Sequence, residues 1–142
     1  MTSSNLHNHT ISLELIQHAR EIIGDRLHRT PLIRSRTLSE QLGANVHLKL
    51  ESLQKTGSFK PRGAFAKLLS LSEAERQCGV VGVSGGNHAQ GLAYAAQQLG
   101  ISATICMPES TPNNYVAATR GYGADIVFCP DIHHAFAKAD QL

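Results

Sequence analysis

The sequence predicts an α/β protein built around a parallel sheet, and two observations lead to this fold class. From Gly79 onward, short apolar or β-branched runs alternate with longer segments of helical character, and glycine or proline separates them. Strands that alternate with helices predict βαβ units, whose strands pair in parallel. The composition agrees, since 42% hydrophobic and 17% charged residues are ordinary for a globular domain.

Residues 1–77 are predicted to contribute helices and a strand to one sheet, separate from a second, smaller sheet built by residues 78–142. Residues 1–10 are polar and without periodicity, so we expect a disordered lead there. Apolar residues at helical spacing predict a helix over 11–23, which Ser12 could start and Gly24 ends. The other elements expected here are an extended linker over 27–33, a helix over 37–42, a strand over 46–50, a helix over about 61–70 and a helical turn over 72–77.

The second half supplies the strands of the predicted parallel sheet. These strands are expected at 80–83, 102–107 and 126–129. Helices are expected at 89–99, from Pro112 to about Arg120 with Thr111 as the cap, and from Ile132 onward. Gly or Pro bounds these segments, and both residues interrupt regular structure.

The stretch 49–64, KLESLQKTGSFKPRGA, carries the candidate catalytic residue Lys60. Pro61 disfavours helical backbone at Lys60 and is common at a first helical position, which predicts that Lys60 lies just before a helix. The positive end of that helix and partial burial beside Phe59 would both favour a free amine. A free amine can form a Schiff base with an aldehyde. The alternative, from this window alone, is an ordinary solvated lysine.

A second window begins with the strand 80–83 and continues as SGGNHAQ from Ser84. A glycine-rich turn between a strand and a helix presents backbone N–H groups and a helix N-terminus to an anion. The side chains of Ser84, Asn87 and His88 add hydrogen-bond donors around the same place. A plain strand–helix turn is the alternative for this window.

Together the two windows resemble the pyridoxal-phosphate enzymes of the threonine dehydratase and serine racemase family (fold type II). The family pattern is K-x-E-x-x-Q-x-T-G-S-F-K-x-R-G-A, followed by S-x-G-N-H-A-Q-G, and this sequence has both motifs in that order and at the family's spacing. The resemblance covers residue 11 to the end. It implies a three-layer parallel-sheet fold with pyridoxal 5'-phosphate as the cofactor and a small amino acid as the substrate.

The resemblance also implies roles for single residues. Lys60 matches the Schiff-base lysine, which also moves the α-proton. Phe59 matches the aromatic residue that packs on the pyridine ring, with a plain core phenylalanine as the alternative. Asn87 matches the residue that hydrogen-bonds the ring hydroxyl, and His88 could instead be a helix-cap histidine. The substrate carboxylate would be held by Ser84, Gly85, Gly86, Asn87 and His88.

The reaction implied is β-elimination, in which an L-threonine- or L-serine-type hydroxyamino acid gives a 2-oxo acid and ammonia. Racemases of the family resemble the pattern S-S-G-N-H, in which the second serine acts as acid and base on the opposite face. Gly85 stands at that position here and cannot donate a proton. This favours elimination over racemisation, with an amino-acid racemase kept as the alternative.

The resemblance divides the chain into two parts. Residues 11–77 would begin the large cofactor-binding domain, and residues 78–142 would form most of a small α/β domain. The family's glycine run for the cofactor phosphate, and its partner for the pyridine nitrogen, would follow Leu142. We therefore expect the N-terminal piece of a longer, homo-oligomeric enzyme, exposed apolar faces on 46–50 and 61–70, poor solubility, and no turnover by the isolated chain.

Composition argues against several other classes. The net charge is +2 and no basic stripe with interleaved aromatics occurs, so no nucleic-acid partner is expected. No apolar run approaches the roughly 18 residues of a membrane span, and no secretory signal is recognisable, which favours the cytoplasm. The cysteines are read as buried free thiols in a reducing compartment: Cys78, Cys106 and Cys129.

Three further readings concern binding without this chemistry. The pairs His7/His9 and His133/His134 lack Cys or carboxylate partners at ligand spacing, so no metal site is expected. A dinucleotide-binding domain is disfavoured because the turn lacks G-x-G-x-x-G. A non-catalytic α/β binding module, which keeps the anion-binding turn without the reaction, remains open.

Overall fold

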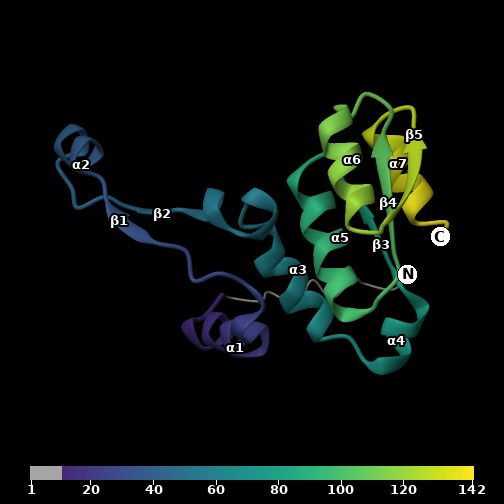
Figure 1. Cartoon of the computed structure of the whole chain (residues 1–142), viewed down its shortest axis with the longest axis horizontal. Helices are drawn as coiled ribbons and strands as arrows, with labels where there is room; N and C mark the ends of the chain where they lie inside the picture. The colour runs from purple at the N-terminus through teal and green to yellow at the C-terminus, as the bar shows by residue number, and fades with distance from the viewer. Residues whose placement is uncertain (1–10) are drawn as a thin grey trace, which may run out of the picture.

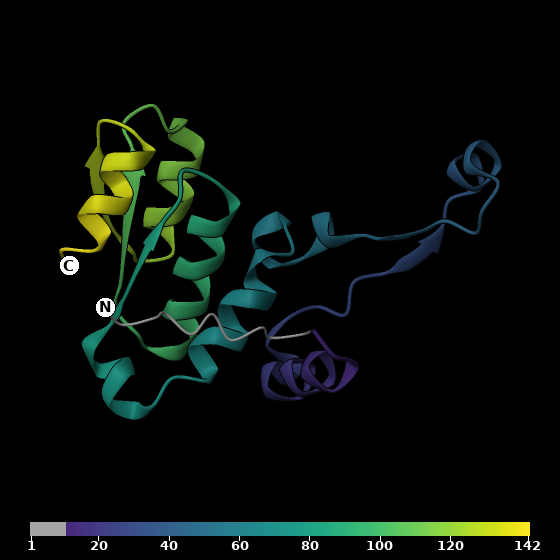
Figure 2. The ribbon, with the colours of Figure 1, turned by 180° about the vertical axis from the view of Figure 1, so that it is seen from behind.

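The computed structural model describes residues 11–142, so the prediction of a disordered lead over 1–10 lies outside the described residues. The chain forms an α/β body, and a slender arm extends from it (Figures 1 and 2). The body contains the parallel sheet, whereas the arm contains a short antiparallel ribbon.

The predicted parallel sheet is present. Its strands are β3 (Val80–Val83), β4 (Ala103–Pro108) and β5 (Asp125–Cys129), and the spatial order is β3-β4-β5. Val80 pairs with Ala103, and Thr104 pairs with Asp125, both in parallel register. The prediction of three strands joined by helices is therefore confirmed, with boundaries that differ by a residue at β4 and β5.

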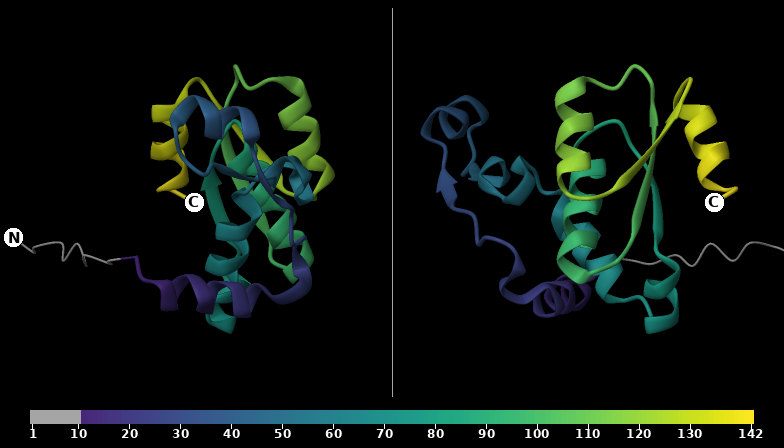
Figure 3. Two further views of the ribbon diagram at one scale, coloured as in Figure 1. Left: turned by 90° about the vertical axis from the view of Figure 1, so that its left-hand side faces the viewer. Right: turned by 45° about the vertical axis from the view of Figure 1, so that its right-hand side comes forward.

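Helices cover both faces of this sheet, which confirms the three-layer arrangement (Figure 3). On one face lie α5 (Asn87–Leu99) and α6 (Asn113–Gly121), and on the other lies α7 (Ile132–Ala139). Successive side chains of β4 point to opposite faces of the sheet, so β4 contributes residues to the hydrophobic clusters on both faces. Ile105 and Met107 belong to the core under α5, whereas Cys106 packs with Cys129 and Ala135 under α7.

Helix α3 (Lys60–Leu69) packs against α5 and against α1 (Leu13–Ile23). Phe65 and Leu68 of α3 are fully buried. The expectation of an exposed apolar face on 61–70 was therefore wrong, because α5 and α1 cover that face within this chain. Ser12 caps α1 by accepting a hydrogen bond from the Leu15 N–H, as predicted.

The arm consists of β1 (Leu32–Arg34), α2 (Arg36–Leu42) and β2 (His47–Lys49), with β1 and β2 antiparallel. Gly43 ends α2 with a φ of 60°, a left-handed conformation that glycine adopts without strain. Leu32 is 63% exposed, and Ile33 and Leu48, which pair across the ribbon, are also exposed. The expectation of an exposed apolar strand near 46–50 is thus confirmed.

Short elements connect these parts: η1 (Gly24–Arg26), η2 (Glu51–Leu53), η3 (Lys55–Gly57) and α4 (Glu73–Cys78). Two predictions need correction here. Cys78 is exposed because it ends α4 at the surface, whereas Cys106 and Cys129 are buried, and all three are free thiols. Thr111 does not cap α6, since Pro112 occupies that position and no side chain caps the helix. No helix within 11–142 is long and apolar enough to cross a membrane.

Candidate active site

Lys60 is the first residue of α3, with Phe59 as the residue before the helix. The prediction that Pro61 keeps Lys60 out of the helical conformation was wrong, because tertiary contacts on both sides hold this first turn in place. The Lys60 Nζ lies 4.9 Å from the centre of the Phe59 ring. Phe59 is 60% exposed, so it is not a core phenylalanine, and its ring remains available to a ligand.

Gly91 brings the two sequence motifs together. A Cβ atom at Gly91 would lie 2.9 Å from the Lys60 Cβ, 3.0 Å from the Lys60 carbonyl carbon and 3.1 Å from the Pro61 nitrogen. Only a residue without a side chain allows α5 to approach the start of α3 this closely. Because α5 begins at Asn87, its first turn lies close to Lys60.

The turn between β3 and α5 leaves several backbone donors free. The Ser84 N–H donates to the Cys106 carbonyl at 3.1 Å, and the Ser84 Oγ accepts from the Gly86 N–H at 3.1 Å. Within residues 11–142, no acceptor meets the N–H groups of Gly85, Asn87 and His88. Free N–H groups at a helix N-terminus favour an anion, so the backbone of this turn suits the predicted role, and anion binding itself stays a prediction.

Helix α5 begins two residues earlier than predicted, and this moves Asn87 and His88 from the turn into its first helical turn. Gly86, rather than His88, occupies the position before the helix, so the helix-cap alternative for His88 is not observed. Partial burial lowers the pKa of His88, and the positive charge of Lys60 lowers it further. The imidazole is therefore held towards its neutral form beside Lys60.

Motif residues on both sides of Lys60 form a polar network around Glu51. The Arg62 guanidinium donates to both Glu51 carboxylate oxygens at 2.8 Å, and the Thr30 hydroxyl also donates to Glu51. Hydrogen bonding from Arg62 holds the pKa of Glu51 below its usual value and raises the pKa of Arg62. Lys49 donates to the Thr30 carbonyl at 2.6 Å. These residues fix the loop that presents Lys60 to the turn.

Gln54 completes this network by bridging to the backbone of His28. Its Oε1 accepts from the His28 N–H at 2.9 Å, and its Nε2 donates to the His28 carbonyl at 2.8 Å. The motif alone did not reveal the positioning role of Glu51, Gln54 and Arg62. Opposite charges at 51 and 62, on either side of the lysine, were the signal that could have indicated it.

Thr56 adopts an unusual backbone conformation in the same loop. Its φ is 61° although it is a β-branched residue, and its Oγ1 is buried without a hydrogen-bond partner among the described residues. Such conformations cost about 1–3 kcal/mol and persist only where the surrounding structure determines them. The loop before Lys60 is therefore a constrained segment rather than a loose linker.

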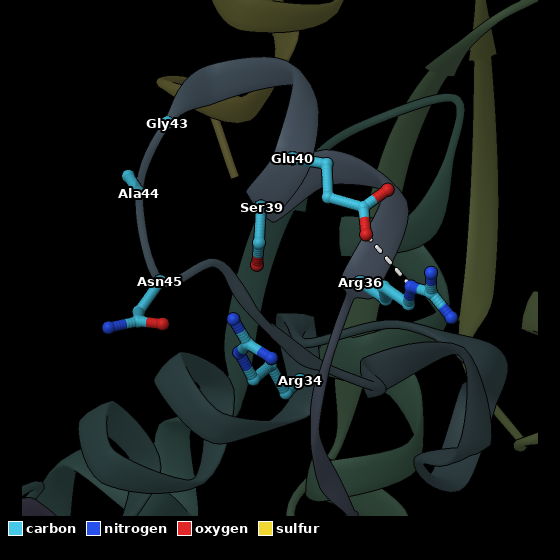
Figure 4. A pocket seen from close by; sticks show the side chains of 7 residues that line it. All are labelled: Arg34, Arg36, Ser39, Glu40, Gly43, Ala44 and Asn45. Carbon is cyan, nitrogen blue, oxygen red and sulfur yellow. Dashed lines mark hydrogen bonds and ion pairs between the residues drawn. The ribbon is translucent and has the colours of Figure 1, made fainter.

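A polar pocket lies elsewhere, at the tip of the arm (Figure 4). Arg34, Glu40 and Asn45 are among its lining residues, and Arg36 pairs with Glu40 at 2.8 Å. None of the residues predicted for the site lines this pocket. In the described part of the chain, no group of three metal-ligating side chains occurs.

The arrangement around Lys60 fits an aldehyde cofactor that also carries an amino-acid substrate. Lys60 supplies a primary amine beside an exposed aromatic ring. The free N–H groups of Gly85, Asn87 and His88 suit a carboxylate. An α/β fold that places a primary amine, an aromatic ring and free N–H groups near one another is compatible with the class of enzymes that hold an aldehyde cofactor on a lysine.

Known proteins agree with this class. The family model described as pyridoxal-phosphate dependent enzyme matches residues 23–142, and the chain belongs to this family. The L-threonine ammonia-lyase of Thermotoga maritima is 51% identical over 117 residues, which is 82% of this chain and 29% of that protein. The L-threo-3-hydroxyaspartate ammonia-lyase of a Pseudomonas species is 56% identical over 101 residues, which is 71% of this chain and 32% of that protein.

The fold agrees as well. The structure of maize serine racemase superposes with a TM-score of 0.84 at 32% sequence identity, covering 92% of this chain and 40% of that one. The chain thus spans about a third of the length of the curated relatives it matches. The cofactor of the family is pyridoxal phosphate.

Proposed function

We propose that this chain carries the cofactor lysine and the carboxylate-binding turn of a β-eliminating lyase, which converts hydroxyamino acids to a 2-oxo acid and ammonia. Relatives named threonine and hydroxyaspartate ammonia-lyases support this class of substrate. The expectation that the isolated chain does not turn over remains a prediction.

Each residue of the site has a proposed task. Lys60 would hold the cofactor covalently and then accept the α-proton of the substrate at its Nζ. Phe59 would pack on the cofactor ring, and Asn87 would donate a hydrogen bond to the ring hydroxyl. When bound, the cofactor supplies an electron sink for the carbanion formed at Cα.

The turn would orient the substrate. We propose that its carboxylate is held by the turn, because free N–H groups at a helix N-terminus favour an anion. The residues of the turn are Ser84, Gly85, Gly86, Asn87 and His88. A fixed carboxylate directs the Cα–H bond towards Lys60, and a neutral His88 leaves the amine of Lys60 without a second positive charge beside it.

The observation that carries this proposal is the close contact at Gly91, which brings Lys60 against the helix that begins at the turn. A base and an anion site must lie together for α-proton removal, and here two segments separated along the chain approach so closely that a side chain at Gly91 would overlap Lys60 and Pro61. A non-catalytic binding module would need the turn but not this contact.

Product analysis tests the reaction class. The chain is incubated with pyridoxal phosphate and L-threonine or L-serine, and 2-oxo acid, ammonia and D-amino acid are measured. The isolated chain is expected to stay at the rate of the free cofactor; within the proposed longer enzyme, turnover should give 2-oxo acid and ammonia in equal amounts, and Lys60→Ala should reduce it to the rate of the free cofactor. Formation of D-amino acid as the main product would contradict the proposal.

An amino-acid racemase is the second candidate, and the likeness to maize serine racemase favours it. Gly85 opposes it, since this position carries no side chain that could move a proton. We further propose that residues 11–77 belong to the large cofactor domain and 78–142 to the small domain. A homo-oligomeric parent enzyme in the cytoplasm also remains a proposal.

A further inference from the structure

Thr111 faces the glycine-rich turn from the loop between β4 and α6. Its N–H donates to the Pro108 carbonyl at 3.0 Å, and Pro112 follows it. The residue is only 8% exposed, and its Oγ1 finds no hydrogen-bond partner within 11–142. The Thr111 hydroxyl therefore acts on its surroundings by its bulk rather than by a hydrogen bond.

This hydroxyl occupies the space next to Gly85. A Cβ atom at Gly85 would lie 2.6 Å from the Thr111 Oγ1, whereas the next atoms, the Thr111 Cβ and the Pro108 Cδ, would each lie at 3.6 Å. The two longer distances are ordinary contacts, so of these atoms only Oγ1 excludes a side chain at position 85. The Thr111 side chain cannot easily rotate or shift away from position 85, because Thr111 is buried, β-branched and followed by proline.

We infer that Thr111 is a specificity-determining residue of the turn: its side chain keeps position 85 free of any side chain. Thr111 acts through position 85 and is therefore a positioning residue. The consequence for the reaction rests on the proposed function. Because position 85 is a glycine, the turn carries no side chain there that could move a proton. Such a turn suits elimination, which needs one base at Cα.

The test compares Gly85→Ala alone with the same change in two Thr111 backgrounds. We expect Gly85→Ala to lower the melting temperature of the full chain by roughly 3–10 °C, as overpacking does. It should also shift the backbone amide NMR signals of Asn87 and His88. Adding Thr111→Ala should restore both readouts, because contacts of 3.6 Å remain. Adding Thr111→Val should restore neither readout, because a methyl group then takes the place of Oγ1 and still overlaps the new Cβ.

Gly86→Ala is the matched control for the melting temperature. An added Cβ there meets nothing within 4 Å, and the φ of −150° lies outside the left-handed region. The inference is overturned if Gly85→Ala is as stable as Gly86→Ala, if both Thr111 changes rescue equally, or if neither rescues. If Gly85→Ala does not fold, a folded Gly85→Ala/Thr111→Ala variant supports the inference and an unfolded one overturns it. No cofactor or substrate is used, so this outcome is independent of the proposed function.

Discussion

Gly91 shows how a single residue can decide the geometry of the site. Its missing side chain allows α5 to touch the backbone of Lys60 and Pro61. The motif S-x-G-N-H-A-Q-G ends at this glycine, and the resemblance alone gave it no role. In the structure the two motifs meet at this contact.

Gly91→Ala should therefore destabilise the chain by about 1–3 kcal/mol, because the new methyl group meets backbone atoms that cannot rotate away. Gly63→Ala is the control within α3, where an added Cβ meets nothing within 4 Å. That change should stabilise the helix by up to about 1 kcal/mol. Urea unfolding of both variants measures the effect, and equal stabilisation by both would refute the close contact.

His88 provides a prediction about pH. Its pKa lies below the usual value of about 6.5 because of partial burial and the charge of Lys60. The folded state then binds fewer protons than the unfolded state, so the contribution of His88 to stability is complete above pH 6.5 or so and is lost as the pH falls through the lowered pKa.

NMR titration of the His88 imidazole checks this directly. Lys60→Gln should raise the pKa of His88 towards its usual value by removing a nearby positive charge. Lys67→Gln, on a later turn of α3, should leave that pKa as it is in the original chain. A His88 pKa that responds to neither change would show that Lys60 and His88 are not neighbours.

At the scale of elements, the start of α3 depends on the Glu51–Arg62 pair. Arg62 lies in the first turn of α3, and Glu51 belongs to η2 at the base of the arm. The bidentate pair joins the two elements across the loop that contains the strained Thr56. Such geometry is specific to arginine and carboxylate groups.

Glu51→Gln should lower the free energy of unfolding by about 1–2 kcal/mol, reduced from the value of a fully buried pair because Arg62 is partly exposed. Glu40→Gln breaks the exposed Arg36–Glu40 pair and serves as the control. We expect a change of less than about 0.5 kcal/mol there. Thermal unfolding at neutral pH compares the two, and a larger effect at Glu40 would contradict this role for Glu51.

The sequence predicted most of the elements but fewer of their contacts. Strands β3 to β5 and the helices between them follow from apolar runs and from Gly and Pro at their ends, which are local signals. The position of Lys60 inside α3 was missed because the local preference of a residue before proline was overridden by the contact at Gly91 and the pair at Glu51. Thr111 was mistaken for a cap because α6 begins one residue later than predicted, which places Pro112 at the cap position.

At the scale of the whole molecule, the arm is the part whose apolar surface stays open. Ile33 and Leu48 form an exposed cross-strand pair, and Leu32 lies next to them. An exposed apolar ribbon promotes association. The double variant Ile33→Thr/Leu48→Thr should therefore reduce light scattering at high protein concentration without lowering the melting temperature. Unchanged scattering would show that the arm does not cause association.

The central claim is that Lys60 is the amine that captures the cofactor. The full chain is mixed with pyridoxal phosphate, its visible absorbance is recorded, and the adduct is reduced with borohydride and mapped by peptide mass spectrometry. The account predicts an absorbance band and a label on the peptide that contains Lys60, lost in Lys60→Ala and retained in Lys67→Ala. A label spread over many lysines, or one unaffected by Lys60→Ala, would contradict it.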